Sequence, residues 1–411
     1  MSRLAVAAAI VAAACHTNPP ALAPAPIAVA NAASLGFDST GLAAVAAYVA
    51  SQVDSAYPSA VIAVGRHGQL LLLAAAGHYG ADDPRPVEPA TIYDLASLTK
   101  VIGLTTACMM LVDEGRLDLD APVQRYLPEF RGPMKEAVIV RHLLTHSSGL
   151  PPWRPLFREA TDRRSALALV DTTPLDSAPG THFAYSDLGA ITLMQVVVRI
   201  ANEPLDRFLA TRVFEPLGMT ATRFLPPKSW RTRIAPTEND TVFRHRLIRG
   251  EVHDENAGRL GGVSGHAGLF STAPDLARFA TWLLALDRAG HEAGSSSARP
   301  PAPCPALCIA DSTVKAFTRR QNVPPGSTRA LGWDTPSDSG YSSAGGKLSR
   351  RSFGHTGFTG TSIWMDPERD VFIILLTNRV NPTRANTKIL QVRSTVADLV
   401  VAAMVGDDRG R

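Results

Sequence analysis

The spacing of apolar residues alternates along the chain between a helical and an extended pattern. Helical spacing over 42–53 is followed by two continuous apolar runs, 60–66 and 69–76. The runs flank His67-Gly68 and predict a β-hairpin. Helical spacing then dominates, and the helices it predicts cover 97–114, 117–127, 138–144, 166–170, 188–201, 208–214 and 275–286.

The last part of the chain returns to extended spacing. Short apolar runs predict strands over 331–333, 352–355, 362–366 and 371–378, and a helix over 384–404 closes the chain. Because strands at both chain ends enclose a long helical region, we expect an α/β (α+β) fold. Its antiparallel sheet would be built from both ends of the chain and flanked by helices. An inserted helical lobe would cover approximately 110–270.

The first residues have the pattern of an export signal. Arg3 precedes an apolar run, 4–14, which is too short to span a bilayer. We therefore predict a signal peptide over 1–14 and an exported protein of the periplasm or cell envelope. Small residues before Cys15 are similar to a bacterial lipoprotein signal, in which that cysteine is lipidated, and an ordinary secretory leader is the alternative. A Pro- and Ala-rich tether over 15–33 would join this leader to a domain over 34–404.

Composition narrows the classes of function. The 411 residues include 41 basic and 37 acidic ones, a net charge of +4 with no dense basic run, so we expect no nucleic-acid binding. Low-complexity sequence over 288–310 predicts a flexible surface insertion. Its Cys304 and Cys308 could form a disulfide or stay unpaired, whereas Cys108 reads as a core residue.

No segment of the sequence carries a cofactor or metal motif. His142 and His146 share a helical spacing but have no third ligand nearby, so we expect no metal. The run 253–256 (His-Asp-Glu-Asn) could line a pocket, but we expect a solvated loop.

The first motif with candidate chemistry is Ser97-Leu98-Thr99-Lys100. A Ser and a Lys three residues apart share one face of a helical turn, and a turn at a helix start offers unpaired N–H groups. A serine hydroxyl is a weak nucleophile, and a lysine in a dry site can lose its proton and act as its base. The alternative is a helix-capping serine with a solvated lysine.

Two further motifs add groups that the first one lacks. In Tyr185-Ser186-Asp187 a phenol beside a lysine could pass a proton to a leaving group, although a packed tyrosine at a helix start is the alternative. In the glycine-rich run 354–360 small residues allow a ligand to lie against a strand edge, and His355 would point into a cleft. A structural glycine turn is the alternative there.

Together the three motifs resemble those of the class C β-lactamase and D-alanyl-D-alanine carboxypeptidase superfamily, which also includes esterases and penicillin-binding proteins. The similarity runs over approximately 34–404, and the setting of the third motif is similar to that of penicillin-binding protein 4B type serine hydrolases. Supporting stretches are 141–150, 214–219, 265–273 and 375–379.

The resemblance implies a role for each catalytic group. Ser97 would form the acyl-enzyme, and Lys100 and Tyr185 would share the work of general base and general acid. The backbone N–H groups of Ser97 and Phe358 would form the oxyanion hole.

The same resemblance places Asp187, His355, Thr356 and Gly357 at the substrate. Two of these residues depart from the family pattern, since His355 stands where many relatives carry Lys and Asp187 where many carry Asn. Both changes disfavour a substrate carboxylate, and Asp187 could instead hold Lys100 in its charged form. They weigh against an efficient β-lactamase and leave acyl transfer intact.

We therefore expect a serine hydrolase without a cofactor, acting on a small molecule or a peptidoglycan-type peptide or ester. A carboxypeptidase-like or penicillin-binding activity ranks first, an esterase second and a β-lactamase third. A non-catalytic binding module with the same fold is the alternative of another class. The only membrane contact expected is the lipid at Cys15, and the oligomeric state stays open.

Overall fold

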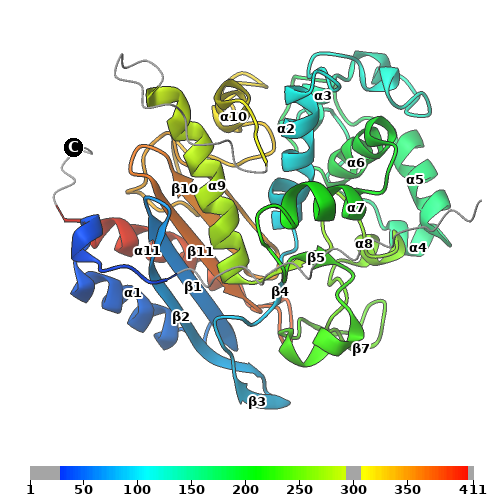
Figure 1. The fold of residues 1–411 in the computed structure, drawn as a ribbon. Helices are drawn as coiled ribbons and strands as arrows, with labels where there is room; N and C mark the ends of the chain where they lie inside the picture. The colour runs from blue at the N-terminus through cyan, green and yellow to red at the C-terminus, as the bar shows by residue number, and fades with distance from the viewer. Residues whose placement is uncertain (1–27, 293–306, 406–411) are drawn as a thin grey trace, which may run out of the picture.

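The computed structural model describes residues 28–292 and 307–405 (Figure 1). The predicted signal peptide, the lipidation site at Cys15, most of the predicted tether and most of the insertion over 288–310 lie outside these residues. No helix within the described ranges is long and apolar enough to cross a membrane.

The main sheet has six strands in the order β3-β2-β1-β11-β10-β9, and each neighbouring pair is antiparallel. This confirms the prediction of one antiparallel sheet from both chain ends. The strands are β1 (Ser59–Arg66), β2 (Gln69–Gly80), β3 (Asp83–Pro86), β9 (Phe353–Thr356), β10 (Ser362–Asp366) and β11 (Val371–Thr377).

The central strands β1 and β11 are mostly apolar and buried along nearly their whole length because both faces of the sheet are covered. Val61 pairs with Leu376 and contributes to one core, whereas Val64 pairs with Ile373 and contributes to the other. Successive side chains of a strand point to opposite faces, so a strand between two cores needs a continuous apolar run. Figure 1 shows α1 (Ser39–Ser51) and α11 (Ile389–Ala402) on one face and α9 (Ala273–Glu292) on the other.

A second lobe, mostly helical, is inserted between the two halves of the sheet, as predicted (Figure 1). Two short strands, β4 (Tyr93–Asp94) and β8 (Leu269–Ser271), pair at its boundary with the sheet lobe. Its helical elements are η2 (Lys100–Thr105), α2 (Thr106–Asp113), α3 (Val140–Leu144), α4 (Leu156–Glu159), α5 (Arg163–Thr172), α6 (Asp187–Ala201), α7 (Leu205–Leu209), η5 (Ala210–Phe214) and α8 (Glu255–Arg259).

Some predicted elements differ from the structure. The run 331–333 is not a strand: Gly332 has a φ of 77° and turns the chain, and the run is apolar because Leu331 and Trp333 are buried. The predicted helix over 117–127 shrinks to the single turn η3 (Val123–Arg125), which begins after Pro122.

The described cysteines differ in state. Cys108 is buried and free, as expected of a core residue. Cys308, which lies before α10 (Asp311–Thr318), is disulfide-bonded. Cys304, its neighbour in the sequence, lies outside the described residues.

Candidate active site

Ser97 lies on a tight turn between β4 and the helix that begins at Lys100. The Asp94 carboxylate accepts a hydrogen bond from the Ala96 N–H at 2.8 Å, which closes the turn. Ala96 has a φ of 46°, in the left-handed region that L-residues seldom adopt. Such conformations persist where the surroundings enforce them, and here the turn places the Ser97 hydroxyl ahead of the first helical residue.

The Lys100 ammonium is held by three partners although it is buried. Its Nζ lies 3.0 Å from Ser97 Oγ, 3.1 Å from the backbone oxygen of His266 and 2.7 Å from the Asp187 carboxylate. The side chain is only 3% exposed. The serine and lysine of the first motif therefore meet, and Asp187 of the second motif joins them.

Burial alone would lower the pKa of Lys100. The Asp187 carboxylate and the Tyr185 phenol outweigh burial, so that the pKa of Lys100 lies above its ordinary value. The resting amine is thus charged, which agrees with the expectation that Asp187 holds Lys100 as an ammonium. It differs from the simpler expectation that a dry lysine is already neutral.

Tyr185 lies between two histidines at the start of α6. Its ring is 4.6 Å from the ring of His146 and 5.9 Å from that of His355, measured between centroids. Ser186 caps α6 through its hydroxyl, and its own N–H donates to His146 Nδ1 at 3.1 Å. Burial lowers the pKa of His146 well below its ordinary value, so the ring is neutral and accepts this bond. His146 therefore positions Tyr185, a role that the sequence analysis did not assign.

The third motif lies on β9, which is the edge strand of the main sheet, as its glycines suggested. His355 Nδ1 donates to the Thr356 carbonyl at 2.8 Å, and its Nε2 is buried without a hydrogen-bond partner among the described residues. Burial lowers the pKa of His355 well below its ordinary value. The neutral ring therefore presents an acceptor nitrogen and no fixed positive charge.

The turn that follows β9 is fastened to the segment before Ser97. Thr359 Oγ1 donates to the Asp94 carbonyl at 2.7 Å, and Thr361 Oγ1 donates to the Leu95 carbonyl at 3.1 Å. Within the described parts of the chain, the N–H groups of Ser97 and Phe358 donate to no protein acceptor. Both predicted oxyanion donors are thus available on segments that are bonded together.

A cleft of about 390 Å³ opens beside these groups. It is lined by residues of all three motifs, namely Ser97, Tyr185, His355, Thr356, Gly357 and Phe358. Three arginines, Arg329, Arg379 and Arg393, also line it, against one carboxylate, Asp334. The sequence analysis missed these arginines because they are single residues in separate segments, with no local pattern to mark them.

The three arginines differ in what they bind. Arg393 donates to the carbonyls of Gly357 and Thr361 at 2.6 and 2.8 Å, and its burial lowers its pKa to about 10. Arg379 donates to the Phe358 carbonyl at 2.8 Å. These two brace the turn after β9, whereas Arg329 lies 3.1 Å from Asp334 across the cleft wall.

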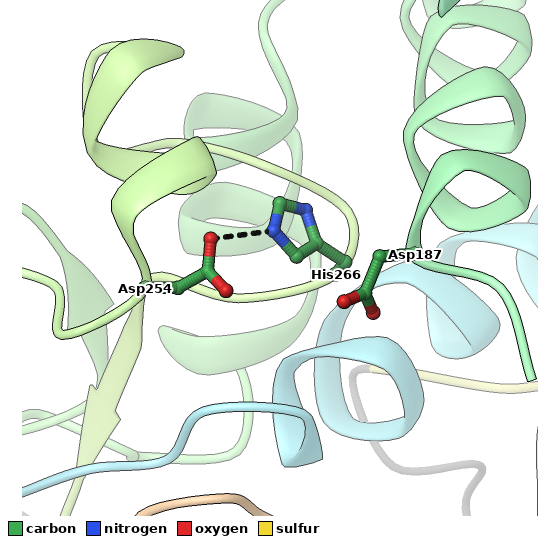
Figure 2. Close-up of side chains that lie close together, drawn as sticks. All are labelled: Asp187, Asp254 and His266. Atoms are coloured by element: carbon green, nitrogen blue, oxygen red, sulfur yellow. Dashed lines mark hydrogen bonds and ion pairs between the residues drawn. The ribbon is translucent and has the colours of Figure 1, made fainter. Parts of the chain in front are cut away.

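Behind Lys100 lies a cluster of two carboxylates and an imidazole, Asp187, Asp254 and His266 (Figure 2). One donor atom of each lies within 4.8 Å of the others. A metal ion accepts such donors, but the Lys100 ammonium already occupies Asp187, and a second cation would meet like charge. The expectation of a solvated loop over 253–256 was wrong: His253 is 5% and Asn256 1% exposed, and the segment bonds to Asp94 and Arg384.

A serine in contact with a buried amine, beside the edge strand of an antiparallel sheet, defines a serine hydrolase of the penicillin-recognising type. Comparison with known families agrees: the model of the family Beta-lactamase matches residues 44–397. The chain belongs to this family.

Similar proteins extend over nearly the whole chain. A protein of Salmonella schwarzengrund named "Putative D-alanyl-D-alanine carboxypeptidase" is 32% identical over 408 residues, covering 90% of both chains, and the one of Salmonella agona is 31% identical with the same coverage.

Solved structures share the fold. EstCE1, a hydrolase with promiscuous acyltransferase activity, superposes with a TM-score of 0.66 at 21% identity, over 87% of this chain and 99% of its own. A penicillin-binding protein homologue from Caulobacter crescentus also gives 0.66 at 21% identity, over 90% and 99%.

Substituting Gly357 tests the fit of the turn against the serine segment. A Cβ at Gly357 would lie 2.1 Å from Thr361 Oγ1 and 2.4 Å from the Leu95 carbonyl oxygen. Gly357→Ala should therefore displace Phe358 and lower the acylation rate of Ser97 by about 10²-fold, the scale of a lost oxyanion donor. Gly346→Ala is the matched control, since a Cβ there meets nothing within 4 Å. Equal acylation rates for both variants in stopped-flow labelling would contradict this assembly of the site.

Proposed function

We propose that the protein is a D-alanyl carboxypeptidase of the cell envelope, which forms an acyl-enzyme at Ser97 and releases a terminal D-alanine. The observation that carries the proposal is the contact of Ser97 Oγ with the buried Lys100 Nζ at 3.0 Å, beside a cleft lined with arginine. The names of the Salmonella relatives support the substrate class. An intact serine and lysine pair weighs against a non-catalytic binding module.

In the first step Ser97 Oγ attacks the carbonyl carbon of the penultimate residue. The serine proton passes to the Lys100 and Tyr185 side chains, and the nearby Tyr185 phenol is one of the groups that raise the pKa of Lys100. The reactive form of this pair has one proton fewer than the resting form. Tyr185, at the start of α6, then returns a proton to the leaving amine.

The negative charge that develops on the substrate oxygen must be stabilised by hydrogen-bond donors that are already positioned. The N–H groups of Ser97 and Phe358 supply them, and the arginines that bind the turn after β9 keep the second donor still. Water later attacks the ester by the same route, with the pair acting again as base.

A peptide that ends in D-alanine carries a carboxylate on the residue that leaves. His355 offers no positive charge to it, and this argued against such a substrate from the sequence. Arg329, which lines the same cleft and is paired with Asp334, supplies a guanidinium for this carboxylate, and Thr356 adds a hydroxyl. The uncharged His355 Nε2 can accept a hydrogen bond from a substrate N–H or from water.

Export and lipid attachment at Cys15 form part of the same proposal. Their support is the apolar run and small residues before Cys15, followed by a Pro- and Ala-rich segment. Such a tether would hold the domain near the membrane surface, where cell-wall peptides are reached.

Penicillin labelling tests the nucleophile and its base. A fluorescent penicillin should label the wild type and not Ser97→Ala. Lys100→Met should lower D-alanine release from a D-alanyl-D-alanine peptide by about 10³-fold or more, because it removes the base. Lys347→Met, at an exposed lysine, is the control and should keep full activity. Turnover of a short ester without penicillin labelling would instead indicate an esterase, and no adduct with any acylating probe would indicate a binding module.

Replacing Arg329 tests recognition of the carboxylate. Arg329→Gln should lower kcat/KM by about 10-fold or more for the peptide with a free C-terminus, since a hydrogen bond to a charged group is lost. For the C-terminal amide of the same peptide, Arg329→Gln should change kcat/KM little. Arg164→Gln, on the exposed side of α5, should leave both values unchanged. Equal losses for acid and amide would refute a carboxylate contact by Arg329.

Membrane fractionation tests the anchor. The wild type should fractionate with membranes and incorporate labelled palmitate, and Cys15→Ser should do neither. Asn18→Ala, in the same segment, should behave as the wild type. A wild-type protein found only in the soluble fraction and free of lipid would refute the anchor.

A further inference from the structure

A second cavity, of about 310 Å³, is lined almost entirely by basic side chains. Two arginine pairs that are distant in the sequence meet there, because Arg319 and Arg320 follow α10 directly and Arg350 and Arg351 lie just before β9. Lys315 of α10 is the fifth cation, two threonines complete the lining, and no carboxylate belongs to it. We call this cavity the basic pocket. The sequence showed no dense basic run because the fold assembles this one from separate segments.

Two guanidiniums of the basic pocket share one carboxylate. Asp338 Oδ1 lies 2.8 Å from Arg320 Nη1 and 3.3 Å from Arg350 Nη1. Arg320 Nε also donates to Thr335 Oγ1 at 3.1 Å, which fixes this guanidinium at the pocket wall. The Arg350 side chain is 81% exposed, and Asp338 is its only polar partner among the described residues. Most of the five N–H donors of Arg350 are therefore available to a ligand.

The other three cations are also incompletely neutralised. Lys315 Nζ lies 3.1 Å from Asp311, and Arg351 Nη2 lies 3.3 Å from Asp287. Arg319 is exposed, and its side chain pairs with no acceptor in the part of the chain that the structure describes. Three described carboxylates thus pair with five cations, which leaves two positive charges in excess. Exposed ion pairs are worth little, so the paired arginines can also turn to an anion.

These features favour a phosphate group over other anions. A guanidinium presents its donors as a planar fork that matches two phosphate oxygens, and such pairs are often bidentate. A phosphate monoester carries close to two negative charges at pH 7, which equals the excess in the pocket. The volume of 310 Å³ lies at the lower end of the range of ~300–1,000 Å³ that is usual for small-molecule sites.

We propose that the basic pocket binds a phosphate-bearing ligand, supplied as a soluble phosphoester or as a lipid headgroup. The pocket is distinct from the active-site cleft but adjoins it. Thr335 lines the pocket, whereas its neighbour Asp334 lines the cleft. Asp334 and Gly354 of β9 exchange backbone hydrogen bonds of 2.8 and 2.9 Å, which hold this dividing segment against the sheet. The inference does not depend on the substrate of Ser97.

Calorimetric titration with glycerol 3-phosphate tests the soluble source. The protein is the full chain with Cys15→Ser, so that no lipid is attached, at low ionic strength, where exposed charges are least screened. We expect one site for glycerol 3-phosphate and none for glycerol. Succinate, which carries two carboxylates, should bind more weakly, and equal affinity for succinate would refute the assignment of phosphate.

Variants of the pocket should change this affinity in opposite directions. Arg319→Gln and Arg350→Gln should each weaken binding by about 10-fold, since each removes hydrogen bonds to a charged group. Asp338→Asn removes a competing carboxylate and should strengthen binding by about 3-fold. Mere damage to the fold would not strengthen it.

Two control variants separate the basic pocket from other positive charges. Arg207→Gln is the matched control, because Arg207 is 76% exposed on α7 and, like Arg350, has a carboxylate partner, Glu203 at 3.8 Å. It should leave the affinity unchanged. Arg329→Gln should also retain binding, because Arg329 lines the active-site cleft and not the basic pocket.

Sedimentation with vesicles distinguishes the two sources. Binding to phosphatidylglycerol vesicles that is lost in Arg319→Gln and kept in Arg207→Gln would indicate a lipid headgroup. Binding of glycerol 3-phosphate without binding to vesicles would indicate a soluble phosphoester. Failure of both probes to bind, or an equal loss in Arg319→Gln and Arg207→Gln, would overturn the inference. Neither probe contains a D-alanyl bond, so these results stand apart from the proposed function.

Discussion

The ion pair between Lys100 and Asp187 is the interaction on which the site depends. Taking two charges out of water is costly, and the cost is offset only if both ions keep good partners. Lys100 meets this condition through Ser97, the His266 carbonyl and Asp187. Since these partners come from three distant segments, the charged amine also holds the segments in register.

The fold delivers these segments to one place. The antiparallel sheet brings β9 to its edge, and hydroxyls of the turn after β9 bond to the backbone just before Ser97. The helical lobe supplies Lys100 at the start of η2 and Tyr185 at the start of α6. The cleft therefore lies where the two lobes meet, and a displacement of either lobe would separate the hydroxyl, the amine and the phenol.

Local patterns predicted the parts of this assembly that are local in origin. Continuous apolar runs predicted β1 and β11, which are buried on both faces, and β2, which is partly buried along most of its length. Helical spacing predicted α1, α6 and α11. The first and third motifs were found because their chemistry needs neighbouring residues on one turn or strand. The run 331–333 was mistaken for a strand because burial alone makes a turn apolar, as Trp333 shows.

Groups that act from isolated positions could not be found in this way. Arg329, His146, Asp254 and His266 each contribute one side chain, and only the packing of distant segments brings them near Tyr185, Asp187 and the cleft. The run 253–256 looked like a solvated loop because its residues are polar. Its partners, among them Asp94 and Arg384, are far away in the sequence.

A crystal structure of the acyl-enzyme formed with a penicillin would test the central claim most directly. We predict continuous density from Ser97 Oγ, with the acyl oxygen between the N–H groups of Ser97 and Phe358 and the penicillin carboxylate facing Arg329. Lys100 Nζ should remain within hydrogen-bond distance of Ser97 Oγ and Asp187. An acyl oxygen that lies outside the oxyanion hole, or a Lys100 side chain that has moved away from Ser97, would contradict the account.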